Sequence, residues 1–224
     1  MSANLIPILW GSTLQTLYMV LMSTVLGTLI GAPLGIFLAT SRRGELLSAP
    51  LVNTALGLVV NAARSTPFII LVVAIIPFTR LIAGTSIGTT AAIVPLTIAA
   101  APFIARLVET AIREVDAGLI EAARAMGATP LQIVRKVLVP EAMPGIILGL
   151  TLAVVSLIGY SAMVGAVGGG GLGDLGIRYG YQRFMPEVML AVVLILIFLV
   201  QAVQSLGEWI AARFDKRAPR NRGR

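Results

Sequence analysis

Few side chains in this chain could carry out covalent or acid–base chemistry. Its 224 residues include no Cys and no His, which excludes thiolate nucleophiles, Ser–His dyads and metal sites built from these residues. The only lysines, Lys136 and Lys216, follow Arg135 and Asp215, so no phosphate-binding loop ending in Gly-Lys is present. We therefore expect a protein that is not an enzyme, binds no metal ion or cofactor directly, and does not itself bind ATP.

A literal G-x-G-x-x-G pattern occurs at Gly168, Gly170 and Gly173, within the glycine-rich run 168–176. Dinucleotide-binding loops follow a β-strand and open a helix within a βαβ unit, whereas this run follows a long apolar stretch. We interpret the run as a flexible outer loop able to change shape or contact a partner protein, with Asp174 as a polar contact.

The stretch 121–140, EAARAMGATPLQIVRKVLVP, is the one long polar segment between runs that are apolar enough for lipid. It predicts two short helices around a bend. Asp116 caps the first helix, Gly127 ends it in the left-handed conformation, and Thr129 caps the second, with Gln132 completing a capping box. A solvated amphipathic hairpin is the simpler interpretation, but so many helix signals in so short a segment favour a docking surface for a partner protein.

A second candidate site lies in the fourth apolar run. Ser156, Gly159, Tyr160 and Met163 stand at positions i, i+3, i+4 and i+7, so they share one face of a helix. Small and polar residues on such a face are typical of packing between membrane helices, and they equally suit the lining of a path through the membrane. The residues alone leave both interpretations open.

The composition that must position these residues is that of a membrane protein, with 57% apolar and 12% charged residues. The net charge of +7 is spread over loops between apolar runs, which indicates the positive-inside rule rather than nucleic-acid binding. We expect contact with membrane lipid and no nucleic-acid partner. No charged region precedes the first apolar run, so we predict that no signal peptide is removed and that the first helix stays as an anchor.

The apolar runs predict an all-α transmembrane domain over residues 1–212, because a crossing of the ~30 Å hydrocarbon layer needs ~20 residues. Five spans are expected, with a polar segment between the third and the fourth and a basic tail after the last. The expected spans are 14–40, 67–83, 88–105, 146–167 and 188–206, the polar segment is 107–145, and the tail is 213–224.

The second span is the least clearly defined. Arg64 separates the uncharged runs 46–63 and 65–79, and no loop lies between them. We expect 46–63 to lie at the cytoplasmic interface or to lead into the span, with Thr66 capping a crossing that starts at Pro67. A single long helix kinked at Pro67 is the alternative.

The distribution of cations orients the chain. With five spans, fourteen of the 17 Lys and Arg residues fall on the side of segment 107–145, against Arg80, Arg178 and Arg183 on the other. A separate crossing by 46–63 would change this division to twelve against five. The positive-inside rule thus places 107–145 and the carboxyl terminus in the cytoplasm and the amino terminus outside. Five spans cannot form two equal repeats, so a path with symmetric walls predicts a two-fold homodimer.

The polar segment resembles the EAA loop of the membrane subunits of binding-protein-dependent ABC importers. That pattern is Glu-Ala-Ala, three residues, Gly, nine residues, Ile, one residue and Leu-Pro. Its spacing is kept throughout, with valine in place of isoleucine and leucine, by Glu121, Ala122, Ala123, Gly127, Val137, Val139 and Pro140. The methionine-importer permeases are similar in particular, over roughly residues 10–210, and the segments that carry this likeness are 64–80, 84–106 and 159–184.

This resemblance implies a five-helix permease core in the bacterial inner membrane, paired with a second copy, two ATP-binding subunits that use the ATP, and a periplasmic or lipid-anchored methionine-binding protein. It implies that the polar segment is a coupling helix, for which the contact residues are Glu121, Ala122, Ala123, Gly127 and Arg135. It favours a translocation pathway along the fourth span, with Tyr160 bonding to a passing amino acid and Met163 as a gate. The residues assigned to that pathway are Ser156, Gly159, Tyr160, Ser161 and Met163.

The expected function is therefore the membrane pathway for uptake of methionine, as the L- or the D-enantiomer. Uptake of another small or polar amino acid and a scaffold without transport activity are the alternatives. An ion-coupled transporter is disfavoured, because it would keep an ionisable group near the middle of a span and none of the five expected spans has one.

Overall fold

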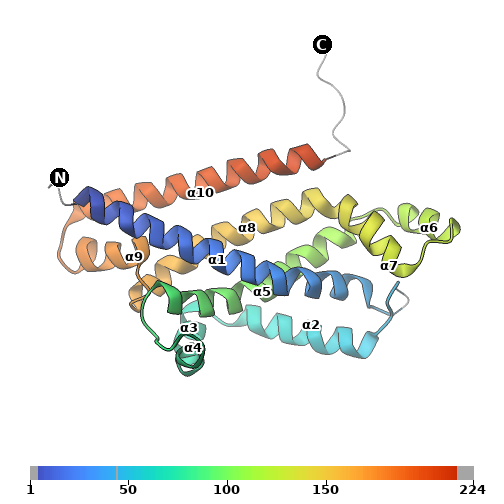
Figure 1. Cartoon of the computed structure of the whole chain (residues 1–224), viewed down its shortest axis with the longest axis horizontal. Coiled ribbons are helices and arrows are strands. Elements are labelled where there is room, and N and C mark those ends of the chain that lie inside the picture. The colour runs from blue at the N-terminus through green and yellow to red at the C-terminus, as the bar shows by residue number, and fades with distance from the viewer. Residues whose placement is uncertain (1–4, 44, 216–224) are drawn as a thin grey trace, which may run out of the picture.

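The computed structural model describes residues 5–43 and 45–215, so most of the predicted basic tail lies outside the described residues. In these ranges the chain is helical and contains no strand. Four long helices run along the long axis of the molecule, and the shorter ones lie at its two ends and along one side (Figure 1). The long helices are α1 (Leu5–Thr40), α5 (Thr89–Arg113), α8 (Val139–Ala166) and α10 (Pro186–Phe214).

The short elements fall into three groups. The first follows α1 and consists of α2 (Pro50–Ser65), α3 (Phe68–Ala74) and α4 (Ile76–Ala83). The second lies between α5 and α8 and consists of α6 (Ala117–Ala125), α7 (Pro130–Ile133) and the π-helical turn η1 (Val134–Leu138). The third lies between α8 and α10 and consists of α9 (Gly171–Leu175) and the π-helical turn η2 (Gly176–Tyr181). The second and third groups occupy opposite ends of the molecule (Figure 1).

Among the described residues, four helical segments are long and apolar enough to cross a membrane, and the bent pair α2 and α3 would make a fifth if it is one span. One of the four is continuous from α7 through η1 to α8, over Pro130–Ala166. The first helix begins at Leu5, nine residues before the expected span 14–40. The long helices therefore extend beyond at least one end of the spans that the sequence predicts.

The expected span 67–83 is not a continuous helix. The chain bends by 101° between α2 and α3, and α3 and α4 are separated at Ile75. Residues 50–65 form a helix that runs beside the long helices (Figure 1), and the side-chain amide of Asn53 donates to the carbonyl of Leu38 at 2.8 Å. The chain thus breaks at Pro67, where the sequence predicted either the start of a crossing or a kink. Thr66 does not cap α3, since its hydroxyl donates back to the carbonyl of Ala62.

Close packing of α1 against α5 holds the centre of the subunit. Gly27, Gly31 and Gly35 recur every four residues on α1, and a Cβ at any of them would collide with α5. At Gly27, for example, it would lie 2.8 Å from the Cβ of Ala100. Small residues let helix backbones approach in a membrane, where dispersion contacts rather than the hydrophobic effect drive association.

The glycine-rich run 168–176 is part of the packed bundle and not a loose loop. Its second half forms α9, in which Leu172 is fully buried. The N–H of Gly171 donates to Gln15 Oε1 and that of Leu172 to Thr16 Oγ1, both at 2.9 Å, so the run is fixed to α1. Glycine is required here because a Cβ at Gly171 would lie 2.6 Å from Thr16 Oγ1.

Candidate functional site

The segment between α5 and α8 has the local structure that its sequence predicts. Asp116 accepts a hydrogen bond from the N–H of Gly118 and caps α6, and Thr129 and Gln132 form a complete capping box at α7. Gly127 has φ +78° and ends α6 in a Schellman arrangement, in which its N–H donates to Arg124 and that of Ala128 to Ala123. We call residues 116–140, the central part of the expected segment 107–145, the coupling segment, after the role that the resemblance implies for it. The local cap predictions are confirmed.

The coupling segment has a buried and an exposed face. Ala123 is 3% exposed and packs with Ile133, Val134 and Leu138, so this member of the Glu-Ala-Ala triplet holds α6 against η1 and does not reach the surface. The other predicted contact residues, namely Glu121, Ala122, Gly127 and Arg135, are all exposed.

The apolar side chains of α6 and α7 are only partly covered by the rest of the subunit. Ile120 is half-buried, whereas Leu119 is 41% and Met126 81% exposed, and Leu131 on α7 is 59% exposed. Three large apolar side chains therefore lie on the surface at this end of the subunit. An exposed apolar patch bordered by polar residues is typical of a protein-binding surface.

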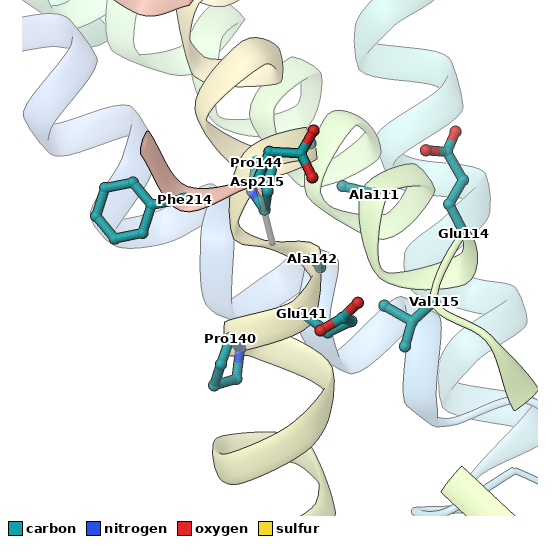
Figure 2. A pocket seen from close by; sticks show the side chains of 10 residues that line it. Ala111, Glu114, Val115, Pro140, Glu141, Ala142, Pro144, Phe214 and Asp215 are labelled. Carbon is teal, nitrogen blue, oxygen red and sulfur yellow. The ribbon is translucent and has the colours of Figure 1, made fainter. Parts of the chain in front are cut away.

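Two cavities lie where the coupling segment joins the long helices. One of about 310 Å³ is bordered by Glu121 and Arg124 of α6 together with the ends of α1 and α5. Another of about 170 Å³ lies among the ends of α5 and α10 and the start of α8, and Figure 2 shows Glu114, Glu141 and Asp215 around it. The described residues contain no group of Asp and Glu side chains that could bind a metal ion.

A buried carboxylate joins three helices beside the coupling segment. Glu109 on α5 is 3% exposed and forms ion pairs with Arg106 at 2.5 Å, with Arg113, and with Arg42 after α1 at 3.6 Å. Arg106 also donates to Asn61 of α2 at 2.5 Å. A buried carboxylate is stable only when it is paired in this way. The cluster therefore ties the ends of α1, α2 and α5 into one unit.

The sequence interpretation counted these arginines only as cytoplasmic charges and missed Glu109. A signal was available, since Arg106 and Arg113 stand at i−3 and i+4 from this carboxylate and must share its face of the helix. The contribution of Arg42 had no such signal, because it depends on how α1 packs against α5.

The face of α8 predicted to line a pathway is partly exposed in the subunit. Met163 is 46% exposed, Gly159 is exposed, and Leu148 and Leu152 continue the same stripe at 47% and 49%. Nothing lies within 4 Å of a Cβ built at Gly159. This stripe has no partner within the described part of the subunit.

The remaining predicted pathway residues are less exposed. Ser156 is half-buried and donates to the carbonyl of Leu152 at 2.9 Å. Ser161 is 2% exposed and donates to the carbonyl of Ile158, so it faces the interior of the subunit and not the stripe. Tyr160 is half-buried, and its ring stacks on Phe68 of α3 with centroids 4.4 Å apart. The stack links the broken second segment to α8, a contact that no sequence pattern indicated.

Comparison with known proteins agrees with this geometry. A family described as "Binding-protein-dependent transport system inner membrane component" matches residues 31–218. A probable D-methionine transport system permease protein MetI of Vibrio cholerae is 56% identical over 206 residues, which cover 92% of each chain. The D-methionine transport system permease protein MetI of Escherichia coli K12 is 52% identical over 162 residues, 71% of this chain and 75% of that one.

Solved structures give the same result. A chain of the MetNI methionine ABC transporter in an inward-facing conformation superposes with a TM-score of 0.94 at 49% identity, covering 96% of this chain and all of that one. An amino acid ABC transporter with histidines superposes with a TM-score of 0.79 at 20% sequence identity, which shows a common fold. The family match spans most of the chain, and the resemblance seen in the sequence is confirmed. The chain belongs to the family of binding-protein-dependent transport system inner membrane components.

Proposed function

We propose that this chain is the membrane-spanning permease subunit of an ATP-driven methionine importer of the bacterial inner membrane. The observation that carries the proposal is the 56% identity, over 92% of both chains, with a permease named for D-methionine transport. The permease forms the path for the amino acid and hydrolyses no ATP, since hydrolysis belongs to separate ATPase subunits.

The proposed assembly contains two copies of the chain, two ATPase subunits and a methionine-binding protein. The exposed stripe of α8, which includes Leu152 and Met163, supports pairing of two copies around the pathway. Each copy crosses the membrane five times, with the broken segment α2 to α4 as the second crossing. The described chain begins and ends at opposite ends of the subunit (Figure 1), as an odd number of crossings requires.

In the proposed orientation, the coupling segment and the carboxyl terminus are cytoplasmic and the amino terminus is outside. The exposed side chains of Leu119, Met126 and Leu131 enter a cleft of the ATPase, and Glu121 and Arg135 supply fixed charges beside them. Gly127 holds the bend that presents this surface.

ATP-driven closure of the two ATPase subunits then draws the two coupling segments together. Each segment continues directly into α8 through η1, and the Glu109 cluster joins the neighbouring end of α5 to α1 and α2. The displacement is therefore passed to whole helices instead of being absorbed in a loop. ATP binding shifts the population between two packings of the dimer that expose the pathway to opposite sides of the membrane.

The pathway in this proposal follows the face of α8 that carries Ser156, Gly159, Tyr160 and Met163. The flexible, polarisable side chain of Met163 closes the path near the two-fold axis, and the Tyr160 hydroxyl bonds to the passing amino acid. Ser161, although adjacent in sequence, supports this face from within the bundle.

Transport by the complete complex in liposomes tests the proposal. The permease is reconstituted with its own ATPase and binding protein, and uptake of labelled L-methionine is measured with competing D-methionine and a panel of other amino acids. We expect ATP-dependent uptake that methionine inhibits most strongly. Stronger inhibition by another amino acid would assign that substrate instead, and ATP hydrolysis without uptake of any labelled amino acid would indicate a scaffold.

A further inference from the structure

A cavity of about 450 Å³ lies at the end of the subunit opposite the coupling segment, where α9 meets α1 and the start of α5. Its lining includes Gln15, Gly88, Thr89 and the charged pair Asp174 and Arg178. The cavity therefore combines one acidic, one basic and two neutral polar side chains. The pathway proposed above does not use it.

The two charged residues differ in how firmly they are held. Asp174 is 9% exposed and sits on α9, which is packed between α1 and α8. Arg178, one turn further on, forms an ion pair with Asp174, but its side chain is 60% exposed. The carboxylate is thus fixed at the cavity wall, whereas the guanidinium group can swing away from it. Because the carboxylate of this pair is buried, a ligand that draws Arg178 away must itself supply a cation to Asp174.

Neutral polar groups complete the lining. The N–H of Gly88 donates to the carbonyl of Gly168 at 2.9 Å, which closes one wall. Gln15 uses its Oε1 to hold Gly171, and this fixes the direction in which its amide NH₂ group points. Gly88 begins α5 without a side-chain cap, so the first N–H groups of that 25-residue helix are not covered by a capping side chain. These groups add hydrogen-bond donors beside Arg178.

We propose that this cavity is an outer binding site for a zwitterionic α-amino acid. Asp174 accepts hydrogen bonds from the ammonium group of the ligand, and Arg178 donates to its carboxylate. One intramolecular ion pair is replaced by two charge-assisted pairs, so the net charge of the cavity does not change on binding. The amino acid side chain then lies against Ile87, which also lines the cavity.

The proposal rests on the proposed function for the nature of the ligand, and it adds a requirement for both charges. A molecule with only the carboxylate leaves Asp174 without a cation once Arg178 turns to the ligand. A molecule with only the ammonium group leaves Arg178 without an anion. The site therefore binds compounds that carry both charged groups of an α-amino acid and tolerates different side chains. It distinguishes amino acids from other compounds without help from the binding protein.

The first test uses the unmodified permease–ATPase complex in nanodiscs, without the binding protein. Saturation-transfer NMR detects binding of L-methionine, of methionine methyl ester and of the deaminated carboxylic acid. We expect a signal for methionine and at least about tenfold weaker binding for both analogues, each of which lacks one charged partner. Absence of a methionine signal, or equal signals for all three compounds, overturns the proposal.

Variants then locate the site. Arg178→Gln and Asp174→Asn are each expected to weaken methionine binding at least about tenfold, whereas Arg178→Lys retains most of it because the charge is kept. Arg183→Gln is the matched control, since this outer arginine stacks on Tyr179 and does not line the cavity. Only variants that co-purify with the ATPase are compared. Unchanged binding in both charge-removing variants places the ligand elsewhere. A wild-type complex that takes up no amino acid refutes the proposed function, which is a separate result.

Discussion

Gly127 offers the sharpest test of the coupling segment, because its contribution can be separated from side-chain contacts. Its φ is +78°, and a Cβ built on it would meet no atom within 4 Å. Gly127→Ala therefore introduces no collision and changes only the backbone preference, by about 1–2 kcal/mol against the left-handed conformation. If the free permease relieves this strain by opening the bend, the same free energy must be supplied on docking. That corresponds to an affinity for the ATPase lower by about 5- to 30-fold.

The assay is the dissociation constant of the nanodisc-embedded permease for its ATPase, measured for a small series of variants. Gly127→Val should weaken binding more than Gly127→Ala, because a branched side chain tolerates the left-handed region less. Gly127→Asn should weaken it least, since asparagine adopts that region at little cost.

The matched control is Gly84→Ala. Gly84 ends α4 with φ +73°, also has no atom within 4 Å of a built Cβ, and lies away from the coupling segment (Figure 1). Gly84→Ala introduces the same local strain at a position without a role in docking. The affinity of this variant permease for the ATPase should therefore equal that of the wild type. Equal losses for Gly84→Ala and Gly127→Ala, or unchanged binding of Gly127→Val, would refute the reasoning.

Three further substitutions test other parts of the subunit. Glu109→Gln removes the buried carboxylate from three partly exposed arginines and should cost about 1.5–3 kcal/mol, seen as a lower thermal unfolding temperature, while the exposed Glu208→Gln should have no effect. Tyr160→Phe keeps the stack on the ring of Phe68, so uptake should fall several-fold at unchanged thermal stability if the hydroxyl binds the amino acid; normal uptake would remove Tyr160 from the pathway. Thr129→Ala breaks the capping box and should destabilise α7 by about 1 kcal/mol, which faster amide hydrogen exchange in residues 131–133 would reveal and unchanged exchange would contradict.

Local signals in the sequence were sufficient for the coupling segment. Asp116, Gly127 and Thr129 each act on backbone groups within five residues, so their effect does not depend on the rest of the fold. The same locality explains why the spacing of the Glu-Ala-Ala pattern could be read directly. The sequence did not show which residues of this pattern face outward, because the burial of Ala123 depends on how α6 packs against η1.

The second span shows the opposite case. Residues 46–83 form a nearly continuous apolar run in which Pro67 indicates a break, but the sequence specifies neither the 101° bend there nor the further break at Ile75. The direction of each piece depends on distant contacts, with Asn53 held at the end of α1 and Phe68 stacked on Tyr160 of α8. The glycine-rich run 168–176 was interpreted as a loop for a related reason, since glycine is typical both of loops and of close helix packing.

The sequence by itself determined that this is a helical membrane protein and where its polar segment bends, and it predicted an orientation from the distribution of its charges. These properties follow from composition and from interactions over a few residues. Only the tertiary structure decided which charges meet. Glu109 pairs with Arg42 from the turn after α1, and Asp174 is brought with Arg178 to a cavity beside Gln15. Both arrangements are possible because glycine contacts allow α1, α5, α8 and α9 to approach more closely than larger residues would permit.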